Sequence, residues 1–328
     1  MAYFHLTIDE RHQIKVLWDQ GYSGRAIARS LGRAPSTVIR ELRRNACPGR
    51  GYEALAANRL ARRRRAEAPR PRALDEPVTR VAVLEKLEAA WSPEQIAGRM
   101  ATLGDLGEGA GRASCRTIYR FVERLTQARN LLTLRWPRPP RKRRAKSSTR
   151  GRIVGRVGIE CRPPEVGDRQ QAGHWEGDTV VGRPGEAVLA TYVERKSRYL
   201  VSFKMPSRHA APMAAATVRH LGRKIHPRLR ATVTFDNGKE FAGFKSMQVR
   251  LGLRAYFADP HSPWQRATNE NTNGLIRHFL PKSVNLTHVS RAEINRIVGL
   301  LNNRPRKCLN WRTPAEVMAQ ELAQGCCT

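Results

Sequence analysis

The first part of the chain has apolar residues at helical spacing, separated by short turn segments. The segment TIDERHQIKVLWDQG starts at Thr7, an N-cap residue, and ends at Gly21, so it predicts a helix. A second short helix is predicted over residues 25–31, and a third begins at Pro35. This spacing is typical of a helix-turn-helix domain, which we place at residues 1–65. The residues predicted on or near the apolar face of the first helix are Ile8, Ile14, Val16, Leu17 and Trp18.

Helical periodicity continues beyond this domain. A helix rich in alanine and arginine is predicted to stop at Pro69. Ser92 and Gln95 then form a capping-box pattern at the start of another helix, and residues 115–125 again have helical spacing. We therefore predict a second helical domain over residues 66–134, with a pattern compatible with another helix-turn-helix unit.

The pattern changes after residue 134. Residues 135–150, RWPRPPRKRRAKSSTR, combine prolines with a basic, serine-containing run that has almost no apolar content. This composition is typical of a linker, which we place at residues 135–165. Its charge also suits contact with DNA.

The last half of the chain has the alternation typical of β-strands. Three strands are predicted within residues 174–205, a helix over about 209–225, and a strand over 231–236 that ends in an aspartate. A helix, a strand and a further helix complete the pattern. The order βββ-α-β-α-β-α is that of the ribonuclease-H-like fold, an α/β architecture with a mixed five-stranded sheet. We predict this fold for residues 166–328.

Charge narrows the choice of partner. The 328 residues include 60 Lys and Arg against 28 Asp and Glu, which gives a net charge of +32. Residues 1–150 carry +18 and residues 151–328 carry +14, so the excess is not confined to one tail. We therefore expect the chain to contact a polyanion along its length, and nucleic acid is the leading candidate.

Other composition signals favour a soluble, intracellular protein. The six cysteines have no C-x-x-C spacing and no paired histidine spacing, so neither a zinc site nor a disulfide framework is indicated. The N-terminus lacks the apolar core of a signal peptide, and no run approaches the roughly 18 apolar residues of a membrane span.

Three carboxylates of the last half are candidates for chemistry. The first and fourth strands of a ribonuclease-H-like sheet are neighbours, so Asp178 and Asp236 are expected side by side, with Glu270 at the start of a following helix. Mutually repelling carboxylates in so basic a protein are explained by divalent cations, and Mg²⁺ or Mn²⁺ takes oxygen ligands. Taken alone, each aspartate is explained at least as well by an ordinary structural role, Asp178 as a turn residue at a strand end and Asp236 as an Asx turn in Asp-Asn-Gly. The rival carboxylates are Glu176, Glu240 and Asp259.

Longer motifs help to decide which carboxylates are catalytic. Those of the last half are HWEGDTVVG (174–182), TYVERKSRYL (191–200), TFDNGKEFA (234–242), YFADPHSPWQRATNENTNGLIRHFLPK (256–282) and LNNRPRKCLNWRTPAEV (301–317). They resemble the catalytic domain of IS30-family transposases, DDE enzymes of bacterial insertion sequences. LGRAPSTVIRELRRN (31–45) and WSPEQIAGRM (91–100) resemble the DNA-binding region of the same family. The resemblance therefore covers most of the chain.

The resemblance implies a DNA transposase whose DDE triad is Asp178, Asp236 and Glu270, with two Mg²⁺ or Mn²⁺ ions per active site. It implies binding to the terminal inverted repeats of an insertion sequence, metal-dependent strand cleavage, and 3′-OH strand transfer into target DNA. The expected partners are double-stranded DNA and further copies of the chain, as a homodimer or higher oligomer. The expected location is the bacterial cytoplasm, in association with the nucleoid.

Two alternatives stay open at this point. One is a DNA-binding regulator with an inactive ribonuclease-H-like domain, and the other is a structure-specific nuclease that does not join strands. The first is suggested by Ala267, where the family pattern usually has glycine just before Thr-Asn-Glu. If that glycine needs a positive φ, Ala267 would strain the approach to Glu270.

DNA contacts are expected first from the third helix, because the N-terminal end of this helix enters the major groove in helix-turn-helix proteins. Arg40 is the first choice for a base contact, and Arg43 or Arg44 for phosphate. An ordinary three-helix bundle with a solvated basic face is the alternative. The full set predicted to contact DNA is Arg25, Ser36, Thr37, Arg40, Arg43, Arg44, Arg116, Thr117, Arg120, Lys239, Asn271, Asn273, Arg277, Lys282, Arg304 and Arg306.

Overall fold

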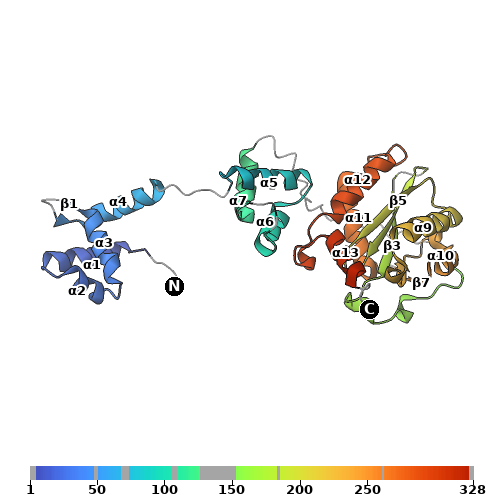
Figure 1. Ribbon diagram of the computed structural model, residues 1–328, viewed down its shortest axis with the longest axis horizontal. Helices are drawn as coiled ribbons and strands as arrows, with labels where there is room; N and C mark the ends of the chain where they lie inside the picture. The colour runs from blue at the N-terminus through green and yellow to red at the C-terminus, as the bar shows by residue number, and fades with distance from the viewer. Residues whose placement is uncertain are drawn as a thin grey trace. The chain divides into compact units, whose positions relative to one another are not determined.

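The computed structural model describes residues 5–47, 51–67, 74–104, 106, 109–125, 153–182, 185–260 and 262–324. The chain forms two compact units, Met1–Pro71 and Arg72–Thr328 (Figure 1). No helix within these described ranges is long and apolar enough to cross a membrane.

The first unit is helical. Its elements are α1 (Ile8–Asp19), α2 (Gly24–Ser30), α3 (Pro35–Asn45), β1 (Ala46–Cys47), β2 (Gly51–Tyr52) and α4 (Ala54–Glu67). Thr7 caps α1, because its hydroxyl accepts a hydrogen bond from Glu10 N at 3.2 Å while Glu10 Oε2 accepts one from Thr7 N at 2.6 Å. Pro35 stands at the start of α3, where a backbone N–H is not needed. The predicted helix-turn-helix is confirmed.

The core of this unit fixes the packing of the first three helices. Ile14, Ile27 and Val38 are fully buried. The predicted apolar face of α1 is wrong in part, since Val16 is 55% exposed and Trp18 is 38% exposed. Val16 lies roughly 200° around the helix from Ile14, and Trp18 belongs to the last turn of α1.

The second unit begins with three helices that have a core of their own. They are α5 (Pro77–Glu88), α6 (Pro93–Thr102) and α7 (Cys115–Arg124). Ser92 and Gln95 form the predicted capping box at the start of α6, with Gln95 N donating to Ser92 Oγ at 3.3 Å and Ser92 N donating to Gln95 Oε1 at 2.9 Å. Leu87, Ile96 and Ile118 bring the three helices together.

Helix α6 is tied to the C-terminal segment of the same unit. Both terminal nitrogens of Arg99 lie 2.7 Å from the carboxylate oxygens of Glu316, and Arg99 also donates to the backbone oxygen of Trp311 at 3.1 Å. The indole of Trp311 packs against Gly98, where a Cβ would lie only 2.3 Å from the ring. The helical segment and the sheet therefore belong to one compact body.

A five-stranded mixed sheet forms the centre of the second unit. Its strands are β3 (His174–Val181), β4 (Val188–Glu194), β5 (Leu200–Met205), β6 (Thr232–Phe235) and β7 (Arg254–Phe257), in the spatial order β5-β4-β3-β6-β7. The first three strands pair antiparallel, whereas β3–β6 and β6–β7 are parallel. The predicted ribonuclease-H-like fold is confirmed, and the first and fourth strands of the domain are neighbours as expected.

Helices cover both faces of this sheet (Figure 1). The larger helices are α9 (Ala210–Lys224), α10 (Phe244–Leu251), α11 (Ala267–Phe279), α12 (Arg291–Asn302) and α13 (Pro314–Gln324), and a single turn, α8 (Glu165–Asp168), precedes β3. Trp175 and Phe235 join the core under α9 and α10, whereas Val180 joins the core under α11 and α12. Because side chains alternate along a strand, Asp178 shares the face of Val180 and is directed to α11.

Part of the predicted linker 135–165 belongs to the domain. Residues 135–152 of the predicted linker lie outside the described ranges, but Ile153 is buried in the core of the sheet. Phe257 N donates to the backbone oxygen of Val157 at 2.9 Å, and Gly158 forms a parallel bridge with Phe257. This end of the predicted linker therefore pairs with the edge strand β7.

Candidate active site and DNA interface

Two of the three predicted carboxylates lie just beyond the point where the parallel pairing of β3 with β6 ends. The register pairs Glu176 of β3 with Thr234 of β6, and Asp178 and Asp236 each follow two residues later. Their side chains are 22% and 37% exposed, so both are accessible to solvent. The sheet topology thus produces the carboxylate pair that the order of strands predicted.

Arg266 connects the two aspartates. Its guanidinium lies 3.6 Å from Asp178 Oδ2 and 3.6 Å from Asp236 Oδ2, and it also donates to the backbone oxygen of Gly177 at 3.2 Å. A positive group is therefore already held between the two carboxylates, which would otherwise repel each other.

Local hydrogen bonds fix each carboxylate. Asp178 accepts from Thr179 N at 2.8 Å and from Asn273 Nδ2 of α11 at 3.0 Å. Asp236 accepts from Gly238 N at 2.9 Å, the Asx turn expected of Asp-Asn-Gly. Burial raises the pKa of Asp178, Arg266 opposes this effect, and the negative charge of Asp236 raises the pKa further.

Glu270 is not grouped with the aspartate pair. It lies in the first turn of α11 and is exposed. Over the described ranges, no three His, Cys, Asp or Glu side chains stand close enough together to hold a metal ion. The condition for strain at Ala267, a positive φ, is not met, because this residue has φ −59° and ψ −27° and begins α11 in an ordinary helical conformation.

The rival carboxylates have structural partners. Glu176 is fully buried and forms an ion pair with Arg195, while its other oxygen accepts from Asn269 N at 2.8 Å. Glu240 is also buried, accepts from Thr179 Oγ1 at 3.1 Å and pairs with Arg208. Asp259 is exposed and accepts from Gln265 Nε2 at 2.8 Å.

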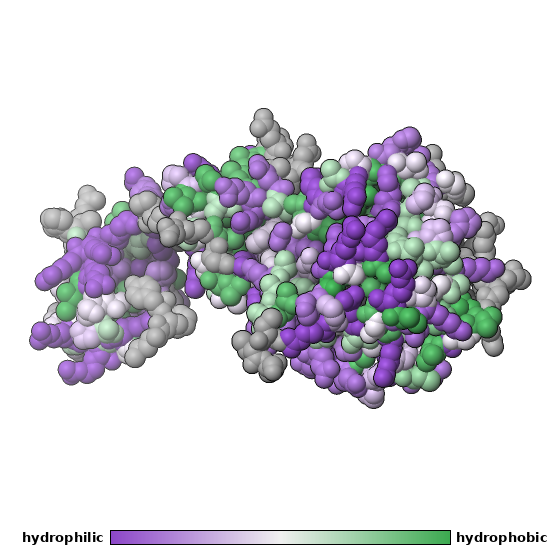
Figure 2. Space-filling view, turned by 45° about the vertical axis from the view of Figure 1, so that its right-hand side comes forward, coloured by the Kyte–Doolittle hydropathy of each residue, from purple (hydrophilic) through white to green (hydrophobic). Residues whose placement is uncertain are grey.

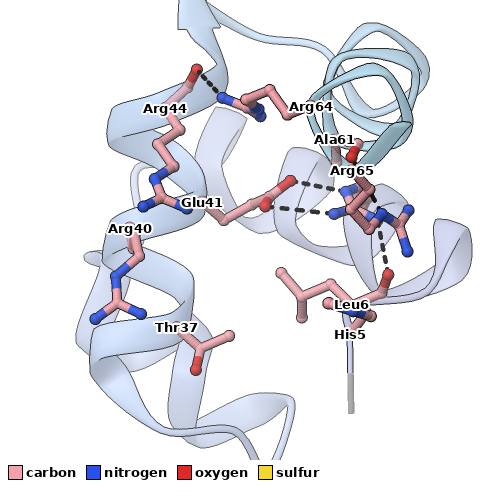
Figure 3. A pocket seen from close by; sticks show the side chains of 10 residues that line it. His5, Leu6, Thr37, Arg40, Glu41, Arg44, Ala61, Arg64 and Arg65 are labelled. Carbon is pink, nitrogen blue, oxygen red and sulfur yellow. Dashed lines mark hydrogen bonds and ion pairs between the residues drawn. The ribbon is translucent and has the colours of Figure 1, made fainter. Parts of the chain in front are cut away.

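The helix-turn-helix presents a basic surface. Ser36, Arg40, Arg43 and Arg44 are exposed on α3, and Thr37 is half-buried. A pocket of about 260 Å³ lies between α3 and α4, and Arg40, Arg44, Arg64 and Arg65 are among its lining residues (Figure 3). Arg11 pairs with Glu41 at 2.7 Å beneath this surface. Hydrophilic residues are also abundant on the visible faces of both units (Figure 2).

Comparison with known proteins decides the family. A helix-turn-helix domain family matches residues 2–45, and an integrase core domain family matches residues 168–263. The chain is 40% identical over 328 residues to the transposase for insertion sequence element IS1086 of Cupriavidus metallidurans, covering 98% of this chain and 96% of that protein. The chain belongs to the IS30 family of transposases. It is 38% identical over 339 residues to transposase InsI for element IS30A of Escherichia coli K12, covering 98% of this chain and 85% of the relative.

A third relative is also similar over nearly its full length. The transposase for element IS4351 of Bacteroides fragilis is 36% identical over 326 residues, covering 98% of this chain and 97% of that protein. The protein is thus a DNA transposase with an N-terminal helix-turn-helix and an integrase core, and an enzyme of the DDE polynucleotidyl transferase class. Integrase-core transposases of this class generally use divalent metal ions.

The aspartate pair of the transposase fits a divalent cation. Carboxylate oxygens are the ligands that Mg²⁺ and Mn²⁺ prefer. The guanidinium of Arg266 lies 3.6 Å from an oxygen of each aspartate, and it places a positive charge where a cation bound by both carboxylates would be. Asp178 and Asp236 thus have the oxygen atoms that such a cation prefers, and they already attract a positive group. Glu270 does not lie in a group with them, so its role as the third ligand stays a prediction.

The remaining residues predicted to contact DNA fall into two groups. The exposed ones are Arg25, Arg116, Arg120, Lys239, Asn271 and Lys282. Others are engaged within the protein. Thr117 is half-buried and bonded to Ser114, and Asn273 donates to Asp178. Arg277 donates to the backbone oxygen of Val181, and Arg306 to that of Leu301.

Arg304 requires a correction. It is only 8% exposed and donates to Gln95 Oε1 at 2.7 Å, while Gln95 Nε2 donates to the backbone oxygen of Pro305 at 2.9 Å. Burial lowers the pKa of Arg304 to about 10, with the nearby charge of Arg306 as a further cause. Arg304 therefore connects α6 to the C-terminal segment instead of contacting DNA.

Two residues that hold the site together were not among the predicted ones. Arg266 joins the two aspartates, and Asn269 bonds to Glu176 and to the backbone oxygen of Thr191. The available signal was the position of both residues in the motif WQRATNEN, within one helical turn of Glu270. Their hydrogen-bond and ion-pair partners lie within the protein.

Proposed function

We propose that the transposase binds the terminal inverted repeats of its element through α1–α3 and cleaves and joins DNA strands at Asp178, Asp236 and Glu270. The aspartate pair on neighbouring parallel strands, with a cationic group held between its carboxylates, is the observation that carries this proposal. The exposed arginines of α3 support the first step, because arginine reads guanine edges and binds phosphate.

Asp178 and Asp236 would hold the divalent cation, Mg²⁺ or Mn²⁺, with two ions per active site. When bound, such ions supply positive charge at the scissile phosphate and lower the pKa of water. Asn273 keeps Asp178 oriented through its 3.0 Å hydrogen bond, and the Asx turn does the same for Asp236. Both carboxylates are thereby fixed before the substrate arrives.

Glu270 completes this arrangement in our proposal. It follows Arg266, the N-cap of α11, by four residues, which is about one helical turn. The buried contact of Asn269 with Glu176 fixes this end of the helix against β3. If a cation took the place of the Arg266 guanidinium between the aspartates, Glu270 would be the carboxylate of α11 to join them as a ligand.

The proposed substrate implies an assembly. Both ends of an element must be held together for insertion into target DNA, so we propose a homodimer or higher oligomer on double-stranded DNA. The protein would then act at the nucleoid, where its element and its targets lie.

The variant Asp236→Asn tests the catalytic site. We expect it to bind an inverted-repeat duplex as the parent does and to lose Mn²⁺-dependent strand cleavage by at least about a thousand-fold, because the amide is a poor metal ligand. Asp259→Asn is the matched control, since Asp259 is exposed and bonded to Gln265. Undiminished cleavage by Asp236→Asn would refute the site. A strand-transfer assay with a pre-cut end then separates a transposase from a nuclease.

A further inference from the structure

A basic pocket lies against the first two turns of α11. Its volume is about 210 Å³, and the lining residues that matter are Arg169, Arg198, Arg306, Thr268, Asn271 and Cys308. No Asp or Glu lines it. One water molecule takes roughly 30 Å³ in the liquid, so the pocket has room for a phosphate group.

The positive charge of this pocket is not balanced by its neighbours. Burial lowers the pKa of Arg306, and the charge of Arg198 acts in the same direction. Burial also lowers the pKa of Arg169, followed by the charges of Arg198 and Arg195. Within the described part of the chain, none of the three lining arginines forms an ion pair. The carboxylate of Glu176, which acts on Arg169 from a distance, is already paired with Arg195.

One donor of the pocket lacks an acceptor. The Nε atom of Arg306 is buried and has no hydrogen-bond partner, although its Nη2 donates to the backbone oxygen of Leu301 at 3.4 Å. A buried polar atom without a partner is unfavourable unless a ligand or water satisfies it. Arg198 is oriented by a 3.0 Å hydrogen bond from its Nη1 to Thr268 Oγ1.

The backbone that presents two of these arginines is unusual. Arg169 has φ 57° and Arg198 has φ 64°, both in the left-handed region that glycine normally occupies. Such conformations cost energy and concentrate at ligand-binding sites. Both side chains line the same pocket although they come from the end of α8 and the turn between β4 and β5.

The pocket lies on a different side of α11 from the aspartate pair. Successive residues are about 100° apart around a helix, so Thr268 lies about 160° from Glu270. In the same way, Asn271 lies about 160° from Asn273. Asn273 contacts Asp178 across the catalytic face. A helix with its side chains is roughly 10–12 Å wide, and this sets the separation of the two sites.

We propose that this pocket binds a backbone phosphate of the DNA strand that passes around the start of α11, a few nucleotides from the phosphate at Asp178 and Asp236. This inference rests on the proposed function. The forked, permanently charged guanidinium groups suit a phosphodiester, which accepts several charge-assisted hydrogen bonds at once. The contact would fix the register of the strand without reading its sequence.

Cys308 provides the measurement, because it is exposed and lines the pocket. In the full chain, the other cysteines, Cys47, Cys115, Cys161, Cys326 and Cys327, are replaced by serine. The rate of alkylation by N-ethylmaleimide, a neutral reagent, is measured alone, with inorganic phosphate, and with a duplex carrying the terminal repeat. A further series of duplexes has a neutral methylphosphonate at one backbone position at a time.

We expect the duplex to slow alkylation at least about ten-fold, and one methylphosphonate position near the cleavage site to restore the rate. Arg169→Gln and Arg198→Gln should each weaken the protection, whereas Arg250→Gln, an exposed residue of α10, should not. Unchanged alkylation on a duplex that the protein demonstrably binds would overturn the proposal. Protection by inorganic phosphate with none by DNA would also overturn it, since the pocket would then serve a free anion.

The alkylation assay also distinguishes failure of this proposal from failure of the proposed catalytic function. Asp236→Asn is expected to keep Cys308 protected by DNA while cleavage is lost. Protection in a parent protein that never cleaves would leave the phosphate pocket supported and the catalytic proposal refuted. Cleavage without protection of Cys308 would support the catalytic proposal and refute the phosphate pocket.

Discussion

Arginine side chains are arranged differently in the two compact units. On α3 of the first unit, Arg40 and Arg43 are exposed and have no carboxylate partner within the described residues. In the second unit, three arginines pair with carboxylates in or beside the core. These pairs are Arg195 with Glu176, Arg99 with Glu316, and Arg266 with Asp178 and Asp236. The number of arginines in a sequence therefore does not identify those that contact DNA.

The difference has a physical origin. An exposed guanidinium keeps its hydration and remains available to a phosphate. A buried one is tolerated only when carboxylates and carbonyl oxygens satisfy it, and the removal of either partner is costly. We therefore expect substitution of the exposed arginines of α3 to change DNA affinity, and substitution of the carboxylate-paired arginines of the second unit to change stability or chemistry.

Breaking the buried pair of the second unit should have the largest effect on stability. Glu176→Gln leaves Arg195 without its counter-ion and places an amide against Asn269 N, in a site that is fully buried. We expect a loss of about 3 kcal/mol in the free energy of unfolding, measured by urea denaturation. Glu94→Gln, whose side chain is 58% exposed and 3.5 Å from Lys307, should change it by less than about 1 kcal/mol.

The same variant tests whether the units are independent. Under conditions in which Glu176→Gln is folded, its affinity for the inverted-repeat duplex should match that of the parent. A large loss of affinity would show that the first unit does not bind DNA on its own and would remove the contrast between the two units.

Arg40→Ala should affect only the first unit. We expect binding to the inverted repeat to weaken by about 1–3 kcal/mol, with discrimination against non-specific DNA reduced at one base position and the stability of both units unchanged. Binding is measured by titration at fixed salt, with Arg59→Ala on α4 as the exposed control. Equal weakening for specific and non-specific duplexes would instead assign Arg40 to phosphate.

Much of the fold could be predicted from the sequence because local signals were strong. The cap at Thr7, the capping box of Ser92 and Gln95, and the alternation within β3–β5 all have the predicted structures. The neighbouring positions of Asp178 and Asp236 followed from the order of elements. These features depend on residues close in sequence or on general rules of topology.

Features that depend on distant residues were not predictable in this way. Nothing local indicates that Arg304 is buried against Gln95, or that residues from 153 onward pair with β7. The parity of Glu176 and Asp178 could not distinguish a structural carboxylate from a ligand, because both face α11. Only the presence of Arg195 beside Glu176 and of solvent beside Asp178 separates them.

The contact between α6 and Trp311 gives the smallest and most selective test. Gly98→Ala places a Cβ 2.3 Å from the Trp311 ring, and such overpacking costs about 1–3 kcal/mol, offset by about 1 kcal/mol of helix propensity. We expect a net loss of about 1 kcal/mol in stability and a shift in tryptophan fluorescence. Gly299→Ala on α12, where no atom lies within 4 Å, should instead stabilise by about 0.5–1 kcal/mol. Equal stabilisation by both variants would mean that α6 does not pack against the C-terminal segment, and that the second helical segment is free to act as a separate DNA-binding module.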